Sequence, residues 1–144
     1  MMQVIETRAA LQAWSDAERA GGRRIGLVPT MGALHTGHLS LVEEARLSAD
    51  LVVVSIFVNP TQFNDAKDFE GYPRVMEDDL AACRNAGVDV VWTPQVEELY
   101  PEGASTWVDV AGLSEPLCGG NRPGHFRGVT TIVSKLFLAA KPHV

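Results

Sequence analysis

The stretch that decides the fold is Ile25-Gly-Leu-Val-Pro-Thr-Met-Gly-Ala-Leu-His-Thr-Gly-His38, where an apolar segment runs through a turn into a helical pattern. Residues 25–29 are apolar and lie between Arg23-Arg24 and the turn, which predicts a short buried strand. The spacing that follows predicts a helix over 35–48. A strand that leads directly into a helix is the repeating unit of an α/β fold.

The same alternation continues on both sides of this stretch. The segment Leu51-Val-Val-Val-Ser-Ile-Phe-Val58 is β-branched and continuously apolar, as in a parallel strand that is covered on both faces. The other expected elements are helices over 7–20, 76–85 and 129–140 and strands over 88–92 and 106–110. This order predicts a Rossmann-like, doubly wound parallel sheet whose ligands bind after Val28 and Val58, at the carboxyl ends of the strands.

Composition narrows the class of protein. The 144 residues are 46% hydrophobic and 21% charged, which suits one globular domain, and the net charge of −6 opposes binding to nucleic acid. Cys83 and Cys118 have no metal-type spacing and favour a reducing cytoplasm. The longest apolar run, 51–58, is too short to span a bilayer, and the N-terminus lacks the features of a signal peptide, so we expect no membrane partner.

The chemistry is expected where the first strand becomes a helix. Unpaired backbone N–H groups and the positive end of the helix dipole favour an anion there, with phosphate the natural candidate. His35 and His38 are three residues apart and project from one side of the first turn, and Gly37 lets a nucleotide approach the backbone. Imidazole N–H donors at this place would stabilise the charge that gathers on phosphoryl oxygens and departing pyrophosphate.

Two other interpretations of these histidines stay open on the residues alone. In one, His35 and His38 cap or decorate the helix and have no chemical duty. In the other, they bind zinc, although no third Cys, His or carboxylate stands at a familiar ligand spacing.

Longer motifs carry a family resemblance. His35-Thr-Gly-His38 after a strand resembles the HxGH signature of the nucleotidylyl transferase superfamily. The flanking segments 28–38, 54–63, 71–74 and 121–129 resemble the pantothenate synthetase (pantoate–β-alanine ligase) family, specifically its N-terminal nucleotide-binding part, over nearly the whole chain. The resemblance implies a cytoplasmic, homodimeric ligase that uses ATP and Mg²⁺ to condense pantoate with β-alanine through pantoyl adenylate, releasing pyrophosphate and AMP.

The resemblance also implies roles for particular residues. His38 would donate a proton or stabilise the transition state, and His35 would assist at the phosphates. Gln62 would hold pantoate and help to place β-alanine, for which an amide offers both a donor and an acceptor. The ATP contacts would come from Met31, Gly32, Ala33, Leu34, His35, Thr36, Gly37 and His38.

Further candidates lie on the same expected rim. Asn59 and Tyr72 are positioned to support substrate binding, or else to shape a turn and to pack. Asp78 and Asp79 open a predicted helix, where they either serve its dipole or hold Mg²⁺. Arg122, His125 and Arg127 form a basic cluster flanked by glycines, which suits either a mobile loop near an anionic substrate or a solvated turn.

The sequence departs from the family in two places. Relatives carry a glutamate in a Leu-Glu-Gly context, whereas this chain has Leu117-Cys-Gly-Gly120, so Cys118 inherits no role from that acid. The family's Gly-Glu-Lys-Asp and Ser-Ser-Arg-Asn segments would lie beyond Val144. We therefore expect residues 1–144 to be a partial nucleotide-binding domain without the last strands or the C-terminal domain, with little or no activity alone and with an unpaired sheet edge that invites association.

Two rival functions remain open at this point. One is a nucleotidylyltransferase that applies the same histidine chemistry to a phosphorylated acceptor. The other is a noncatalytic nucleotide-binding or dimerising module. Pantoate-dependent exchange of pyrophosphate into ATP separates the first rival from the ligase, and titration with ATP or pantoate tests the second.

Overall fold

The computed structural model describes residues 1–113 and 122–144 and contains one four-stranded parallel sheet in the order β1-β4-β3-β2. The strands are β1 Gln3–Ile5, β2 Ile25–Thr30, β3 Leu51–Ile56 and β4 Val90–Trp92. The helices are α1 Arg8–Ala20, α2 Thr36–Ser48, α3 Ala66–Gly71, α4 Met76–Asn85, α5 Val96–Leu99 and α7 His125–Ala140, with a 3-10 helix η1 at Pro60–Gln62. The predicted α/β class with a parallel sheet is confirmed.

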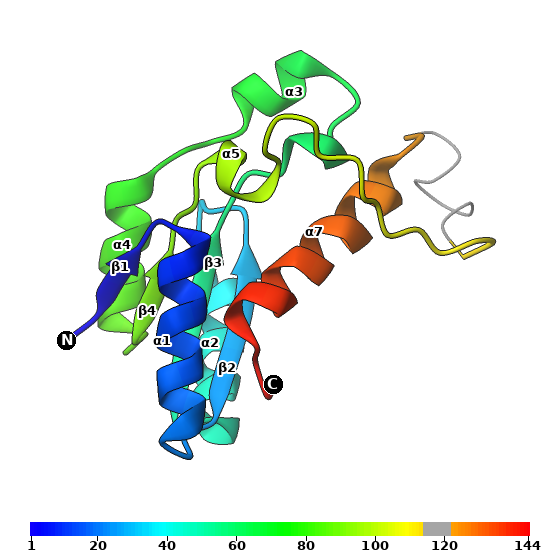
Figure 1. Cartoon of the computed structure of the whole chain (residues 1–144). Helices are drawn as coiled ribbons and strands as arrows, with labels where there is room; N and C mark the ends of the chain where they lie inside the picture. Colours follow the sequence, from blue (N-terminus) through cyan, green and yellow to red (C-terminus); the bar gives the residue numbers. More distant parts are fainter. Residues whose placement is uncertain (114–121) are drawn as a thin grey trace.

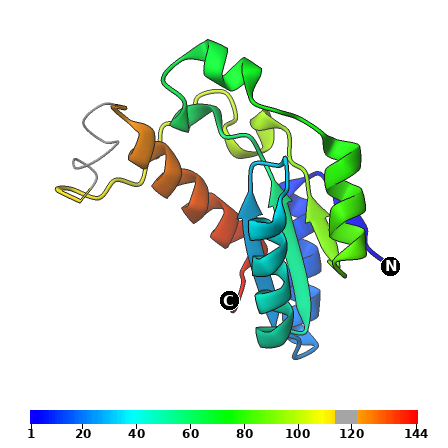
Figure 2. The same cartoon turned by 180° about the vertical axis from the view of Figure 1, so that it is seen from behind.

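Helices cover both faces of the sheet, as a doubly wound fold requires. On one face, α1 and α7 pack with α5 around Leu11, Trp92 and Leu136, and on the other face α2 and α4 pack around Val42 and Val54 (Figures 1 and 2). Each such side chain contributes about 1.5–3 kcal/mol when it is fully buried. Because both faces are apolar, the polar groups of a site are confined to the ends of the strands.

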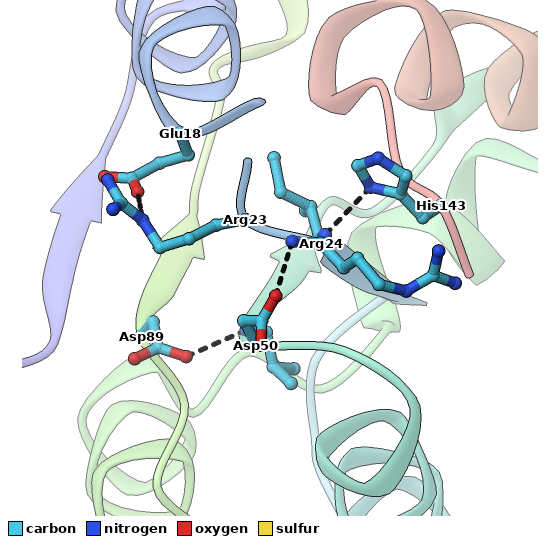
Figure 3. Close-up of polar contacts among 8 residues, drawn as sticks. Glu18, Arg23, Arg24, Asp50, Asp89 and His143 are labelled. Carbon is cyan, nitrogen blue, oxygen red and sulfur yellow. Dashed lines mark hydrogen bonds and ion pairs between the residues drawn. The ribbon is translucent and has the colours of Figure 1, made fainter. Parts of the chain in front are cut away.

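The amino ends of the strands are fixed by side chains that accept backbone N–H groups. The Asp50 carboxylate accepts the N–H of Arg24 at 2.7 Å, and the Asp89 carboxylate accepts the N–H of Val52 at 2.8 Å (Figure 3). Hydrogen bonds to a charged acceptor are stronger than neutral ones. These contacts satisfy the backbone at the starts of β2 and β3, opposite the carboxyl ends where ligands are expected.

The outer edge of β2 is partly covered by the last residues of the chain. Ile25 donates its N–H to His143 Nδ1 at 2.9 Å and accepts the N–H of His143 at 2.7 Å, while Leu27 donates to the carbonyl of Val144 at 2.8 Å. Two residues further along, on the same edge, Pro29 has no N–H to donate. The edge predicted to be unpaired is thus occupied at its start and lacks one donor beyond it.

The strand predicted at 106–110 is wrong. Side chains of α7 satisfy this backbone instead: Thr131 Oγ1 accepts the N–H of Val108 at 2.9 Å, and Thr130 Oγ1 donates to the Val108 carbonyl at 2.5 Å. The segment is extended but lies along a helix, so its β-branched residues have no neighbouring strand with which to pair.

Other boundaries differ by a few residues. The last helix begins at His125, four residues before the predicted start, because Gly124 adopts φ 78° and turns the chain into the helix. The strand predicted over 51–58 ends at Ile56, and the one predicted from 88 begins at Val90. The elements β1, η1, α3 and α5 were not predicted; all are six residues or shorter.

Candidate functional site

The loop between β2 and α2 is built on the carboxyl ends of two neighbouring strands. Thr30 Oγ1 donates to the carbonyl of Ser55 on β3 at 2.8 Å and accepts the N–H of Gly32 at 3.1 Å. Gly32 and Ala33 then adopt φ values of 81° and 51°. Positive φ is unusual for alanine, so this part of the loop has a conformation that its surroundings must hold.

His35 and His38 cap the helix that they begin. His35 Nδ1 accepts the N–H of Gly37 at 3.1 Å, and His38 Nδ1 accepts the N–H of His35 at 3.2 Å. An imidazole nitrogen that accepts a hydrogen bond carries no proton, so in each neutral ring the proton resides on Nε2. Both histidines therefore cap the helix, and each ring keeps one N–H donor for a ligand.

The electrostatics favour the neutral form of His38. Partial burial lowers the pKa of His38 from its ordinary value and the neighbouring His35 lowers it further, while Asp79 opposes the shift. The two ring centroids are 4.1 Å apart. A neutral His38 keeps both its Nδ1 acceptor for the cap and its Nε2 donor for a ligand.

Gly37 makes room for an imidazole as well as for any ligand. A Cβ added at this position would lie 2.9 Å from His35 Cε1 and 3.0 Å from His35 Nδ1. Its N–H, which the sequence suggested for an anion, is already used by His35. The donors available to an anion at this turn therefore include the two Nε2–H groups.

A cavity of about 260 Å³ brings together residues that are far apart in the sequence. Five of the predicted site residues line it, namely Met31, His38, Asn59, Gln62 and Tyr72. Its remaining lining is Pro29, Thr30, Phe57, Val129, Ile132, Val133 and Leu136. A larger hollow of about 460 Å³ is lined by Met31, Gly32 and Asp79 but by none of His35, His38 and Gln62, so more of the predicted residues converge on the smaller cavity.

Asn59 is buried and binds protein groups at both ends of its amide. Its Nδ2 donates to Gln62 Oε1 at 3.0 Å and to the carbonyl of Gly128 at 3.1 Å, and its Oδ1 accepts the Thr61 hydroxyl at 2.9 Å. Only 1% of Asn59 is exposed. Asn59 therefore supports the site by orienting Gln62: because Oε1 is taken, the Gln62 Nε2 group is the donor left for a ligand.

The start of α7 is pressed against η1. A Cβ at Gly128 would lie 2.5 Å from the carbonyl oxygen of Thr61, so only glycine permits this approach. The ring of His125 donates from Nδ1 to the carbonyl of Gln62 at 2.9 Å. These contacts join Gln62 to the helix that supplies the apolar wall of the cavity.

Asp78 and Asp79 lie in different surroundings. Asp78 is exposed, whereas Asp79 is 3% exposed and uses its two oxygens to accept the N–H groups of Ala33 and Leu34. Within residues 1–113 and 122–144, no cluster of three or more His, Cys, Asp or Glu side chains is able to hold a metal ion. The structure thus gives Asp79 a partner in the loop, and the Mg²⁺ role suggested for the two carboxylates stays a prediction.

Two of the three residues of the basic cluster lie on a helix and not in a loop. His125 and Arg127 belong to α7, and the Arg127 guanidinium lies 4.6 Å from the ring centre of Trp107. Arg122 is exposed just before the helix. The segment from Leu117 to Gly120, with Cys118, lies outside the described residues.

Sequence reasoning missed two parts of the site. The apolar wall formed by Val129, Ile132, Val133 and Leu136 was expected on a helix but not at the cavity, although the 3–4 residue spacing of these side chains is a visible signal. The contact between Asp79 and the loop joins residues 45 and 46 positions apart, for which one sequence offers no signal.

Together, fold and site define the class: a doubly wound, parallel α/β domain with a polar site at the carboxyl ends of β2 and β3. The model of the pantoate-beta-alanine ligase family matches residues 3–144, and the chain belongs to this family. Among the described residues, no helix is long and apolar enough to cross a membrane.

Individual relatives agree with this assignment. The chain is 58% identical over 142 residues to a pantothenate synthetase of Acetivibrio thermocellus and 54% identical to one of Geobacter sulfurreducens, covering 99% of this chain and 50% of each relative. A crystal structure of the Thermus thermophilus enzyme superposes with a TM-score of 0.90 at 49% identity, over 98% of this chain and 50% of that one. A Francisella tularensis ligase complexed with "Beta-gamma ATP and Beta-alanine" gives 0.93 at 38% identity, over 99% and 54%. The chain thus spans about half the length of these relatives.

Proposed function

We propose that this chain is the nucleotide-binding part of an ATP-dependent ligase that joins pantoate to β-alanine through pantoyl adenylate. The observation that carries the proposal is the cavity that Met31, His38 and Gln62 line together. The relative whose structure holds a β,γ-ATP ligand and β-alanine supports ATP and an amine as substrates. The family assignment favours the ligase over a nucleotidylyltransferase.

The cavity suits pantoate in both size and polarity. A volume of about 260 Å³ is below the range of roughly 300–1,000 Å³ that drug-sized ligands fill, which fits a small hydroxy acid. Val129, Ile132 and Val133 form an apolar wall for the two methyl groups of pantoate. Gln62 Nε2 donates to its oxygens, and Asn59 keeps the Gln62 amide in that orientation.

The two histidines act on the nucleotide. When the pantoate carboxylate attacks the α-phosphorus of ATP, negative charge grows on the phosphoryl oxygens and on the departing pyrophosphate. The Nε2–H groups of His35 and His38, with the rest of residues 31–38, bind these oxygens more strongly in the transition state than in the ground state. The β-alanine amine then attacks the acyl carbon, and AMP departs.

The remaining parts of the proposal concern the whole protein. Mg²⁺ enters with ATP as part of the substrate, and Asp79, whose oxygens accept two loop N–H groups, is not needed as its ligand. We propose that turnover requires the half of the relatives' length that this chain does not span, so residues 1–144 alone have little or no activity. We further propose a cytoplasmic homodimer that binds neither nucleic acid nor membrane, in keeping with the negative charge and the free, buried Cys83.

The test is pantoate-dependent exchange of labelled pyrophosphate into ATP, with the chain extended by the second half of its relatives. Replacing His38 with alanine should lower exchange on the order of 100- to 1,000-fold. Gln62→Ala should raise the KM for pantoate, while Gln12→Ala, on α1, should leave it unchanged. Exchange that needs a phosphorylated acceptor instead of pantoate would contradict the ligase and favour the transferase.

A further inference from the structure

A buried carboxylate outside the histidine motif holds the nucleotide loop. Asp79 lies in the first turns of α4, and its Oδ2 accepts the N–H of Ala33 at 2.9 Å while its Oδ1 accepts the N–H of Leu34 at 2.8 Å. A Cβ at Gly32 would lie 3.0 Å from Asp79 Oδ2, so the carboxylate is in direct contact with the turn. Hydrogen bonds from N–H groups to a carboxylate are among the strong ones in proteins.

The loop needs this support because its backbone is strained. Ala33 has φ 51°, and a non-glycine residue in this region costs on the order of 1–3 kcal/mol. Ala33 also donates one of the two N–H groups that Asp79 accepts. The hydrogen bond therefore offsets the backbone strain at the residue that carries it. The next residue after Leu34 is His35, whose backbone N–H and ring both take part in the cap of α2.

We infer that Asp79 is a positioning residue: it holds Ala33 and Leu34 in the strained turn and thereby places His35 and His38 for the nucleotide. It touches no reacting atom and acts through the loop. The placement of the histidines for a nucleotide rests on the proposed function, whereas the contact between Asp79 and the loop does not. It gives the aspartate a structural task at a position where the sequence suggested a metal ligand.

The first test measures the loop without any ligand. In Asp79→Asn the amide has one oxygen acceptor and an NH₂ group that repels the second N–H, so hydrogen exchange at Ala33 or Leu34 should become at least about tenfold faster by NMR, equivalent to about 1.4 kcal/mol. The pKa of His38 should fall, because the Asp79 charge raises it. Asp78→Asn is the matched control, since this neighbour is exposed, and it should leave both loop amides unchanged. Unchanged exchange at both amides in Asp79→Asn would overturn the inference.

Two further variants separate geometry from charge and from misfolding. Asp79→Glu keeps the charge but moves it by one methylene, so it should speed exchange at the loop amides while leaving a carboxylate near His38. Ala33→Gly combined with Asp79→Asn removes the cost of positive φ, so it should restore part of the lost protection. No recovery in this double variant would show that strain at Ala33 is not what Asp79 offsets.

Catalysis is tested in the chain extended to the length of its relatives. A misplaced loop should reduce pantoate-dependent exchange on the order of 100-fold in Asp79→Asn and raise the KM for ATP, whereas Glu77→Gln, at an exposed acid in the same turn of α4, should leave activity unchanged. Loss of amide protection with full activity would overturn the positioning role. If the unsubstituted protein shows no ATP-dependent exchange at all, the proposed function fails, whereas the loop measurements still decide whether Asp79 holds the turn.

Discussion

The imidazole of His38 makes a contact that depends on its protonation state. Its Nδ1 accepts a backbone N–H in the cap of α2, and only the neutral ring leaves that nitrogen free to do so. Partial burial, followed by the neighbouring His35, lowers the pKa of His38, which protects the cap at neutral pH.

This arrangement predicts a dependence of stability on pH. Because the folded-state pKa of His38 is below its ordinary value of 6.5, the unfolded chain binds more protons between the two values. The contribution of the neutral ring to the free energy of unfolding is therefore complete above about pH 6.5 and is lost as pH falls through the folded-state pKa. Urea denaturation of the wild type should show this loss, and His38→Asn, which keeps a cap acceptor but does not titrate, should show less of it. Equal pH dependence in both proteins would contradict the assignment.

At the same scale, local pattern predicted that His35 and His38 stand at a helix start, and the structure confirms this. The ATP contacts of residues 31–38 came from the family resemblance and stay a prediction. Asn59 was expected either to support substrate binding or to shape a turn, and its amide caps η1 and orients Gln62 through four hydrogen bonds. Burial and long-range hydrogen bonds decide such roles, and neither can be read from residue order.

Among the elements, α7 and η1 depend on one glycine. A Cβ at Gly128 would overlap the backbone of Thr61, and overpacking of this kind costs about 1–3 kcal/mol. We expect Gly128→Ala to lower the free energy of unfolding by about that amount and to weaken pantoate binding. Gly71→Ala, at a helical glycine where an added Cβ meets nothing within 4 Å, should change stability by less than about 1 kcal/mol. Thermal denaturation of both variants checks this, and equal melting temperatures would contradict it.

Which elements could be predicted follows from their length and burial. The helices α1, α2 and α4 have clear patterns and natural boundaries, and they were predicted to within a residue or two. The strand β1 has three residues on one edge of the sheet and carries no pattern of its own. Residues 106–110 have strand-like composition, but the hydroxyl groups of Thr130 and Thr131 compete successfully for their backbone.

For the whole molecule, we expect the outer edge of β2 to limit association through the sheet. His143 and Val144 pair with the start of β2, and Pro29 withholds a donor farther along. Pro29→Val should supply that N–H and increase sheet-mediated self-association, measured by sedimentation velocity at several concentrations. Pro101→Val, in an exposed segment outside the sheet, is the control and should behave as the wild type. If Pro29→Val sediments as the wild type does, proline is not what limits pairing at this edge.

The contact between Gly128 and Thr61 also bears on which wall of the cavity is able to move. The backbones of Gly128 and Thr61 are in contact, and the Asn59 amide bonds to both residues. We therefore expect η1 and the start of α7 to move together. We therefore expect this wall of the cavity to keep its shape when a substrate binds. The turn after Met31 is held by Asp79, so the ring of Tyr72 is the better place for a spectroscopic label that reports closure.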